Sequence, residues 1–106
     1  MRPIFTAQLD QRRPVLVLTR AHVVEHLTRV TVAPITSRVR GLRTEVVVGI
    51  DNGLDQESVV NCDNIVTVDR AALGTRIGSL LDHQEPELAA AIAWAFDLAS
   101  SNDARS

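Results

Sequence analysis

The apolar run Pro14-Val15-Leu16-Val17-Leu18 stands near the start of the chain, directly after two arginines. The run is too short for a helix, and a continuous apolar stretch of this length is typical of a strand that is buried on both faces. We therefore expect this strand to belong to the hydrophobic core. The rest of the fold can be traced outward from it.

Several other segments have the pattern of short strands. Residues 4–9 partly alternate between polar and apolar residues, as in a half-buried strand. Pro34 within the run 30–35 predicts an edge strand or a bulge, because proline has no N–H to donate. Further strands are predicted at residues 44–49, 58–61 and 64–68, with turns at 10–13 and 51–53. Five or six such strands predict a mainly β (α+β) fold, a small closed or nearly closed barrel.

Two helices complete this prediction. A short one is expected at residues 20–27, with Thr19 as its cap. A C-terminal α-helix is expected to begin at a capping box of Asp82 and Glu85, with a proline in its first turn. The Ala-rich composition of residues 88–99 favours the helical conformation.

The apolar face of the C-terminal helix spans an arc of about 200°, which is wider than packing against one surface requires. We expect this helix either to be buried between the barrel and a neighbour or to form part of a subunit interface. The polar residues 100–106 are expected to fray. The residues of the arc are Leu88, Ile92, Trp94, Ala95, Phe96, Leu98 and Ala99.

The composition is that of an ordinary globular protein. With 106 residues, 45% of them hydrophobic and 23% charged, the chain is expected to form one domain over residues 1–106. No apolar run approaches the ~18 residues of a membrane span, and without a signal peptide the cytoplasm is the expected location. Cys62 is the single cysteine, so no intramolecular disulfide is possible, and we expect a buried and inert thiol.

Charge is distributed unevenly along the chain. All eleven basic residues are arginines; residues 1–43 carry a net charge of +6 and residues 44–106 a net charge of −8. Such asymmetry is typical of proteins that bind a polyanion. The alternative is that the two halves neutralise each other across the folded domain.

One group of residues could form a phosphate site. Arg13 directly precedes the buried strand, and the strand at 30–35 is followed by Thr36 and by hydroxyl and arginine side chains. If these two strands are neighbours, a guanidinium, a hydroxyl and a basic loop meet at one end of the barrel, where they could bind RNA phosphates. The alternative is a solvated loop and a salt-bridged arginine. The candidate RNA-binding residues are Arg12, Ser37, Arg38, Arg40 and Arg43.

The histidines do not indicate a metal site or a catalytic centre. His22 and His26 are four residues apart, a spacing compatible with two metal ligands, but no third ligand of a suitable type lies nearby in the sequence. His83 precedes the C-terminal helix, where the helix dipole disfavours its charged form, and we expect a local structural role, with general acid–base catalysis as the alternative. No metal and no cofactor are therefore predicted.

Four blocks of sequence resemble, in order, those of the MazF/PemK-like toxins of toxin–antitoxin pairs. The resemblance extends from residue 4 to about residue 81. It implies an SH3-like/CcdB-like barrel that forms a homodimer and cuts single-stranded RNA without a metal, by attack of a 2′-hydroxyl on the adjacent phosphate. The blocks are residues 13–19, 32–37, 53–70, and the pairs Leu73-Gly74 and Ile77-Gly78.

The resemblance also assigns roles to residues and partners. The catalytic arginine of the family falls on Arg13, the catalytic threonine on Thr36, and a base-contacting amide on Asn64. A cognate MazE-like antitoxin with a disordered acidic tail is the implied partner. DNA is reached only through that antitoxin, and no membrane is involved.

The sequence departs from the family pattern in three places. Only Asp10-Gln11-Arg12 separates the first two strands, where most members have a longer loop with a glutamate. Val66 occupies a position where arginine is common, and the loop of residues 38–43 is rich in arginine for its position. These departures predict an altered cleavage sequence with nuclease activity retained.

Two other functions are compatible with a barrel of this size. A CcdB-like toxin that poisons a topoisomerase would need a C-terminal Trp-Gly-Ile, whereas this chain ends in Asp103-Ala104-Arg105-Ser106. A non-catalytic RNA-binding barrel would need aromatic side chains on which bases stack, and this sequence has no Tyr, two Phe and one Trp. The endoribonuclease toxin is therefore the favoured interpretation.

Overall fold

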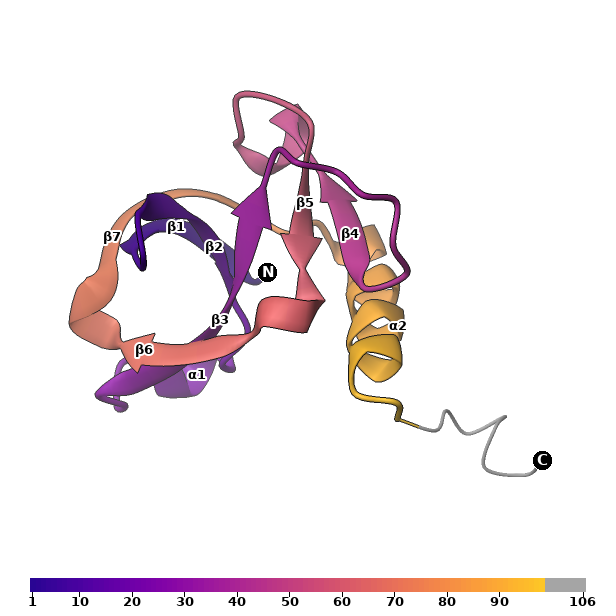
Figure 1. The fold of residues 1–106 in the computed structure, drawn as a ribbon. Helices are drawn as coiled ribbons and strands as arrows, with labels where there is room; N and C mark the ends of the chain where they lie inside the picture. Colours follow the sequence, from indigo (N-terminus) through magenta and orange to yellow (C-terminus); the bar gives the residue numbers. More distant parts are fainter. Residues whose placement is uncertain (99–106) are drawn as a thin grey trace.

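The apolar run after Arg13 forms most of strand β2 (Arg12–Val17), which lies between β1 (Pro3–Gln8) and β3 (Arg29–Thr36) in an antiparallel sheet (Figure 1). The computed structural model describes residues 1–98 of the chain. Leu16 faces one apolar cluster, and Val15 and Val17 face another; all three are fully buried. The prediction of a strand buried on both faces is confirmed.

Strand β3 divides the sheet into two parts. Its first half pairs with β6, and its last two residues pair with β5, which in turn pairs with the edge strand β4. Strands β6, β3, β2, β1 and β7 curve into a ring, and β5 and β4 extend to one side of it (Figure 1). The fold class is the predicted one. The remaining strands are β4 (Glu45–Val48), β5 (Ser58–Asn61), β6 (Val66–Asp69) and β7 (Leu73–Ser79).

Pro34 does not mark an edge strand, contrary to one of the two predictions made for it. Pro34 is buried in β3 opposite Val15 of β2, so β3 has neighbours on both sides. On its other side, the pairing with β6 ends at Val32 and the pairing with β5 begins at Ile35. Proline is compatible with this position because β3 passes there from one partner to the other.

Strand β7 was not predicted. Its sequence contains two glycines, which weaken strand propensity, and its pairing with β1 is interrupted by two shifts of register. Gly78 is required there, because a Cβ atom at this position would clash with the carbonyl oxygen of Asn52. A close approach of this kind depends on a segment distant in sequence, so the local pattern gave no sign of it.

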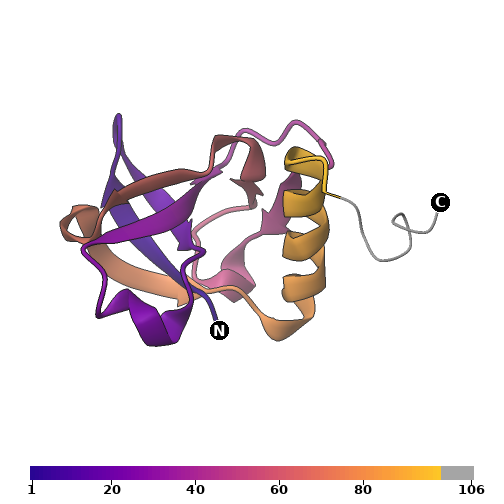
Figure 2. The ribbon, with the colours of Figure 1, turned by 90° about the horizontal axis from the view of Figure 1, so that it is seen from below.

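The core consists of two clusters that share β2 and β3. The smaller fills the ring and includes Val15, Val17 and Val30. The larger lies between the sheet and the C-terminal helix α2 (Glu85–Ala95), which stands beside β4 and β5 and away from the ring (Figure 2). Helix α2 contributes Leu88 and Ala91 to it.

The short helix α1 (Ala21–Val24) is half the predicted length, and its predicted cap is wrong. Thr19 Oγ1 accepts a hydrogen bond from the backbone N–H of Thr31 at 2.9 Å, so its side chain ties the chain to β3 instead. Four 3₁₀ turns connect the other elements: η1 (Ile50–Asn52), η2 (Cys62–Asn64), η3 (Arg70–Ala72) and η4 (Asp82–Gln84).

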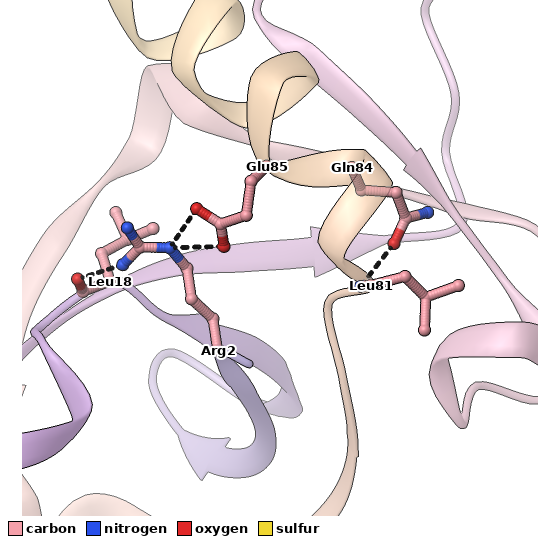
Figure 3. A network of polar contacts seen from close by, with 5 residues as sticks. All are labelled: Arg2, Leu18, Leu81, Gln84 and Glu85. Carbon is pink, nitrogen blue, oxygen red and sulfur yellow. Dashed lines mark hydrogen bonds and ion pairs between the residues drawn. The ribbon is translucent and has the colours of Figure 1, made fainter.

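The predicted capping box of Asp82 and Glu85 is not formed, and α2 begins without a side-chain cap. The cap lies one turn earlier, at the 3₁₀ turn η4, where Gln84 Oε1 accepts a hydrogen bond from the backbone N–H of Leu81 at 2.9 Å (Figure 3). Gln84 is preferred because its side chain is buried against Asn52, whose Nδ2 donates to Gln84 Oε1 at 2.7 Å. Glu85 instead accepts from Arg2 Nε at 3.0 Å and 3.2 Å, which fixes the N-terminus of the chain to the helix (Figure 3).

Helix α2 ends at Ala95, before the predicted end at residue 99. Asp97 adopts a φ of 54°, a left-handed conformation that stops the helix. Ala99 and the predicted frayed tail 100–106 lie outside the described residues. Within residues 1–98, no helix has the length and apolar character needed to cross a membrane.

The predicted wide apolar face of α2 is only partly buried. Leu88 is inside the core, and Ile92 and Ala95 pack against it. Trp94, Phe96 and Leu98 are 59%, 56% and 57% exposed, so this end of the helix is uncovered in the single chain. Exposed apolar groups of this kind mark interaction surfaces.

Cys62 lies fully buried in the larger cluster, as predicted. Burial, with a smaller contribution from the Asp63 carboxylate, raises the pKa of the Cys62 thiol from 9.0 to about 11. The thiol is therefore protonated and unreactive at neutral pH.

Candidate active site

Arg13 and Thr36 lie side by side at one end of the sheet. Strands β2 and β3 are neighbours, and their register pairs Val15 with Pro34, so that its continuation by two residues along each strand places Arg13 level with Thr36. The condition set by the sequence, that these two strands be adjacent, is met. A guanidinium and a hydroxyl are thus held on two paired strands.

Two clefts meet at this pair of residues. The first has a volume of about 450 Å³, and Asp55 is its acidic residue; we call it the Asp55 cleft. The second, about 340 Å³, contains Arg38 and Arg40, and we call it the arginine cleft. Arg13, Thr36 and Gln11 line both. A chain-like ligand could therefore lie across Arg13 and Thr36 with a part in each cleft.

Arg13 is only weakly paired within the protein. Its side chain is 24% exposed, and Nη2 lies 3.5 Å from the exposed carboxylate of Asp10, a weak ion pair. Its Nε is buried and has no hydrogen-bond partner among residues 1–98. The exposed part of the side chain, and not Nε, is what an anion in the clefts can contact.

Thr36 complements this guanidinium. Its Oγ1 accepts a hydrogen bond from the backbone N–H of Arg38 at 3.1 Å. That contact uses a lone pair of the hydroxyl and leaves its proton free to be donated to a phosphate oxygen. The same contact fixes the beginning of the loop that carries Arg38.

The structure brings most of the predicted RNA-binding residues to these clefts. Arg38, Arg40 and Asn64 line the arginine cleft, and Ser37 lines the Asp55 cleft. Asn64 is positioned by the η2 turn, in which Asn61 Oδ1 accepts from the backbone N–H of Asp63 at 3.0 Å.

Arg12 and Arg43 line neither cleft. Successive side chains of a strand point to opposite faces, so Arg12 projects away from Arg13; its Nη2 donates to Thr6 Oγ1 at 3.4 Å. Arg43 lies at the far end of its loop, with its guanidinium 4.6 Å from the centre of the Trp94 ring in a cation–π contact. The structure therefore gives no support for placing these two arginines in the site.

Several residues that line the clefts were missed by the sequence analysis. Gln11 belongs to the turn before Arg13, and its place beside the two arginines was the only available signal. Asp55 and Gln56 follow the turn at Gly53, whose φ of 91° directs the chain back toward β7. Glu45 and Asn61 are paired across β4 and β5 and enter the arginine cleft together. These placements depend on strand pairing and could not be predicted from local patterns.

Part of the unequal charge distribution is neutralised within the fold. Arg2 pairs with Glu85 and Arg29 with Asp69, so part of the basic segment neutralises part of the acidic one. Within the part of the chain that the structure describes, Arg38 and Arg40 form no ion pair. In the same residues, no group of three or more His, Cys, Asp or Glu side chains could hold a metal ion, and His22 and His26 are exposed.

Comparisons with known proteins show the family of the chain. Residues 2–96 match the model of the PemK-like, MazF-like toxin of type II toxin–antitoxin systems. The chain is 63% identical over 98 residues to "Endoribonuclease MazF3" of Mycobacterium tuberculosis strain H37Rv, covering 92% of this chain and 95% of that protein. It is 39% identical to "Probable endoribonuclease MazF5" of the same strain, over 81% of this chain and 80% of that one.

Solved structures have the same fold. The structure named "Mycobacterium tuberculosis toxin MazF-mt6" superposes with a TM-score of 0.91 at 62% identity, covering 93% of this chain and all of that one. "Endoribonuclease in complex with its cognate antitoxin from Mycobacterial species" superposes with a TM-score of 0.81, covering 92% of this chain and 94% of that one; at 24% identity this likeness shows the fold alone. On the match over residues 2–96 and the similarity of these relatives, the chain belongs to the PemK-like, MazF-like toxins of type II toxin–antitoxin systems.

Proposed function

We propose that this protein is the toxin of a toxin–antitoxin pair and acts as a sequence-specific endoribonuclease on single-stranded RNA. The observation that carries the proposal is the meeting of the two clefts at Arg13 and Thr36. The word endoribonuclease in the name of the relative at 63% identity supports it. No observation favours a topoisomerase poison or a non-catalytic RNA-binding barrel.

The reaction proposed is an internal transesterification. The 2′-oxygen of a ribose attacks the adjacent phosphorus, the bond from phosphorus to the 5′-oxygen breaks, and a 2′,3′-cyclic phosphate and a 5′-hydroxyl remain. The 2′-hydroxyl loses its proton and the departing 5′-oxygen gains one. Negative charge grows on the non-bridging phosphate oxygens during the attack, and stabilising that charge is the main task of the site.

Arg13 and Thr36 are the proposed catalytic residues. The exposed part of the Arg13 guanidinium and the Thr36 hydroxyl donate to the non-bridging oxygens from fixed positions on paired strands. Arginine keeps its positive charge, so its role is electrostatic stabilisation of these oxygens.

RNA on either side of the scissile phosphate is proposed to occupy the two clefts. Arg38 and Arg40 are proposed to bind phosphates in the arginine cleft, with Asn64 beside them as a contact to a base. Ser37 is proposed to contact RNA in the Asp55 cleft. Single-stranded RNA fits such a site because its bases can be splayed into separate pockets.

The proposed partners are a second copy of the chain and a MazE-like antitoxin with an acidic tail. Trp94, Phe96 and Leu98 leave an apolar surface at the end of α2 that a twofold-related copy would cover. Sedimentation at micromolar concentration should give twice the mass of 11.6 kDa, and a monomer at high concentration would refute the dimer. The proposed location is the cytoplasm, where the RNA substrates are.

The experiment that tests this function is cleavage of RNA in the presence of EDTA. Structured and unstructured RNAs are incubated with the purified protein, and the new ends are mapped and their chemistry determined. We expect cuts at a repeated short motif in unpaired regions, with cyclic phosphate ends. Intact RNA under all conditions, while expression still stops growth, would favour the topoisomerase poison.

A further inference from the structure

Glu45 is an acidic residue inside a cleft that is otherwise suited to RNA. Its carboxylate, at the start of β4, accepts hydrogen bonds from three consecutive backbone N–H groups. Oε1 accepts from Arg40 at 3.1 Å, from Gly41 at 2.8 Å and from Leu42 at 3.1 Å, and Oε2 accepts from Arg40 at 3.3 Å. Three N–H groups converging on one carboxylate form a small anion-binding loop whose anion is part of the chain.

These contacts shape the loop of residues 37–44, which has no regular secondary structure. Gly41 has a φ of 74°, a left-handed conformation that turns its N–H toward Glu45. The backbone N–H of Glu45 also donates to the carbonyl of Leu42 at 3.1 Å. At the other end of the loop, Thr36 Oγ1 holds the backbone N–H of Arg38. The loop is thus fixed at both ends by side chains of the cleft.

The guanidinium groups of this loop stay available. Glu45 accepts a hydrogen bond from the backbone N–H of Arg40 but makes no ion pair with the guanidinium of Arg38 or Arg40. These two guanidinium groups form no ion pair with any acidic side chain of residues 1–98. An acid that paired with these arginines would compete with RNA phosphates for them. An acid that binds only the backbone fixes their position and leaves their charge for the ligand.

We propose that Glu45 is a positioning residue for RNA, which holds the loop so that Arg38 and Arg40 bind phosphates on one side of the scissile bond. This inference rests on the endoribonuclease function proposed above. The proposal predicts a change in RNA affinity on neutralising Glu45 that is opposite in sign to the change expected from charge alone. Removing a negative charge from an RNA-binding cleft should tighten binding, whereas removing the group that orders the loop should weaken it.

The experiment compares Glu45→Gln and Glu45→Asp with the unaltered protein on an RNA oligonucleotide that the latter cleaves. Glu45→Gln keeps the size but leaves one acceptor oxygen, and Glu45→Asp keeps the charge but shortens the reach. We expect both to raise KM about tenfold, equivalent to about 1.4 kcal/mol, with kcat lowered by less than about threefold. If both phosphate contacts are lost, the slope of log affinity against log salt falls by about 1.4, since each contact contributes about 0.7 on single strands.

Glu25→Gln is the matched control, because Glu25 is an exposed acid whose side chain lines neither cleft. It should leave KM within about twofold of the unaltered value. Thermal unfolding of each variant establishes that it is folded, and if Glu45→Gln fails to fold, Glu45→Asp carries the test. A lower KM for Glu45→Gln together with an unchanged KM for Glu45→Asp would overturn the proposal.

A second arm separates positioning from a general structural effect. In an Arg38→Ala/Arg40→Ala background, Glu45 has no guanidinium groups left to position, so adding Glu45→Gln should change KM by less than about twofold. A full additional tenfold loss in that background would overturn the inference. Failure of the function itself is recognised separately, since the unaltered protein would then cleave no RNA.

Discussion

The two clefts share Arg13, Thr36 and Gln11 but differ in every other charged group. The arginine cleft adds the guanidiniums of Arg38 and Arg40 and the carboxylate of Glu45, which binds the backbone of Arg40. The Asp55 cleft adds a carboxylate and apolar walls that include Pro14 and Ile35. Arg13 balances Asp55 in the second cleft, whereas Glu45 balances only one of three arginines in the first, so phosphates are attracted more strongly to the arginine cleft. We propose that the RNA backbone lies mainly in the arginine cleft and that the Asp55 cleft contributes to the selection of a base with amino groups.

The largest effect is expected from the residues that both clefts share. Arg13→Ala or Thr36→Ala should lower kcat by about 10²–10³, as does loss of one preorganised donor in other enzymes that stabilise an oxyanion. The measurement is single-turnover cleavage of a labelled RNA oligonucleotide. Arg20→Ala is the matched control, because this arginine is exposed and lines neither cleft, and it should lower the rate by less than about threefold.

Removing the charge of one cleft should weaken RNA binding without a comparable loss of chemistry. For Arg38→Ala/Arg40→Ala we expect KM to rise by about ten- to a hundredfold, on the basis of about 1.4 kcal/mol for each contact. The salt dependence of RNA binding should decrease at the same time. If kcat fell as strongly as it does in Arg13→Ala, the division of roles between shared and separate residues would be wrong.

The Asp55 cleft should influence which sequence is cut. Asp55→Asn replaces two acceptor oxygens with one acceptor and one donor. The preference of cleavage for one base over another at one position of the RNA should therefore change by about tenfold, the equivalent of about 1.4 kcal/mol. The distribution of cut sites in a random RNA pool measures this preference. If the distribution of cut sites is unchanged and the salt dependence of RNA binding changes, Asp55 acts by repelling phosphates and does not select a base.

The last effect concerns stability and not activity, at the turn that carries Asn64 into the arginine cleft. Cys62 begins the same turn, and burial raises its pKa to about 11, so the folded state favours the protonated thiol. The contribution of the protonated Cys62 thiol to the free energy of unfolding is fully present below pH 9.0. As the pH rises from 9.0 toward 11, this contribution is lost at up to about 1.4 kcal/mol per pH unit. Unfolding in denaturant at pH 8 to 11 measures it. Cys62→Ala should lack this decline, which is easily seen because the sequence has no Tyr and its basic residues are all Arg.

Periodicity was reliable where one strand or helix has a strong pattern of its own. The double-sided burial of β2, the turn at Gly53 and the presence of a C-terminal helix were all predicted. The missed elements depend on distant segments: β7 follows the register of β1 despite its glycines, and the side chain of Gln84 caps the turn η4 before α2 because it is buried against Asn52. Local propensity does not contain such information.

The sequence by itself determined the β-rich class, the central apolar strand and the arginine and hydroxyl side chains that follow two strands, because these depend on composition and on a period of two or 3.6 residues. The tertiary structure decided which of these side chains meet. The pairing of β2 with β3 places Arg13 beside Thr36. The side chain of Arg12 lies on the opposite face of β2 and contacts Thr6, and the guanidinium of Arg43 lies over the Trp94 ring outside both clefts. Strand register and contacts between segments distant in sequence determine where these arginine side chains lie, and neither can be predicted from residues that are neighbours in sequence.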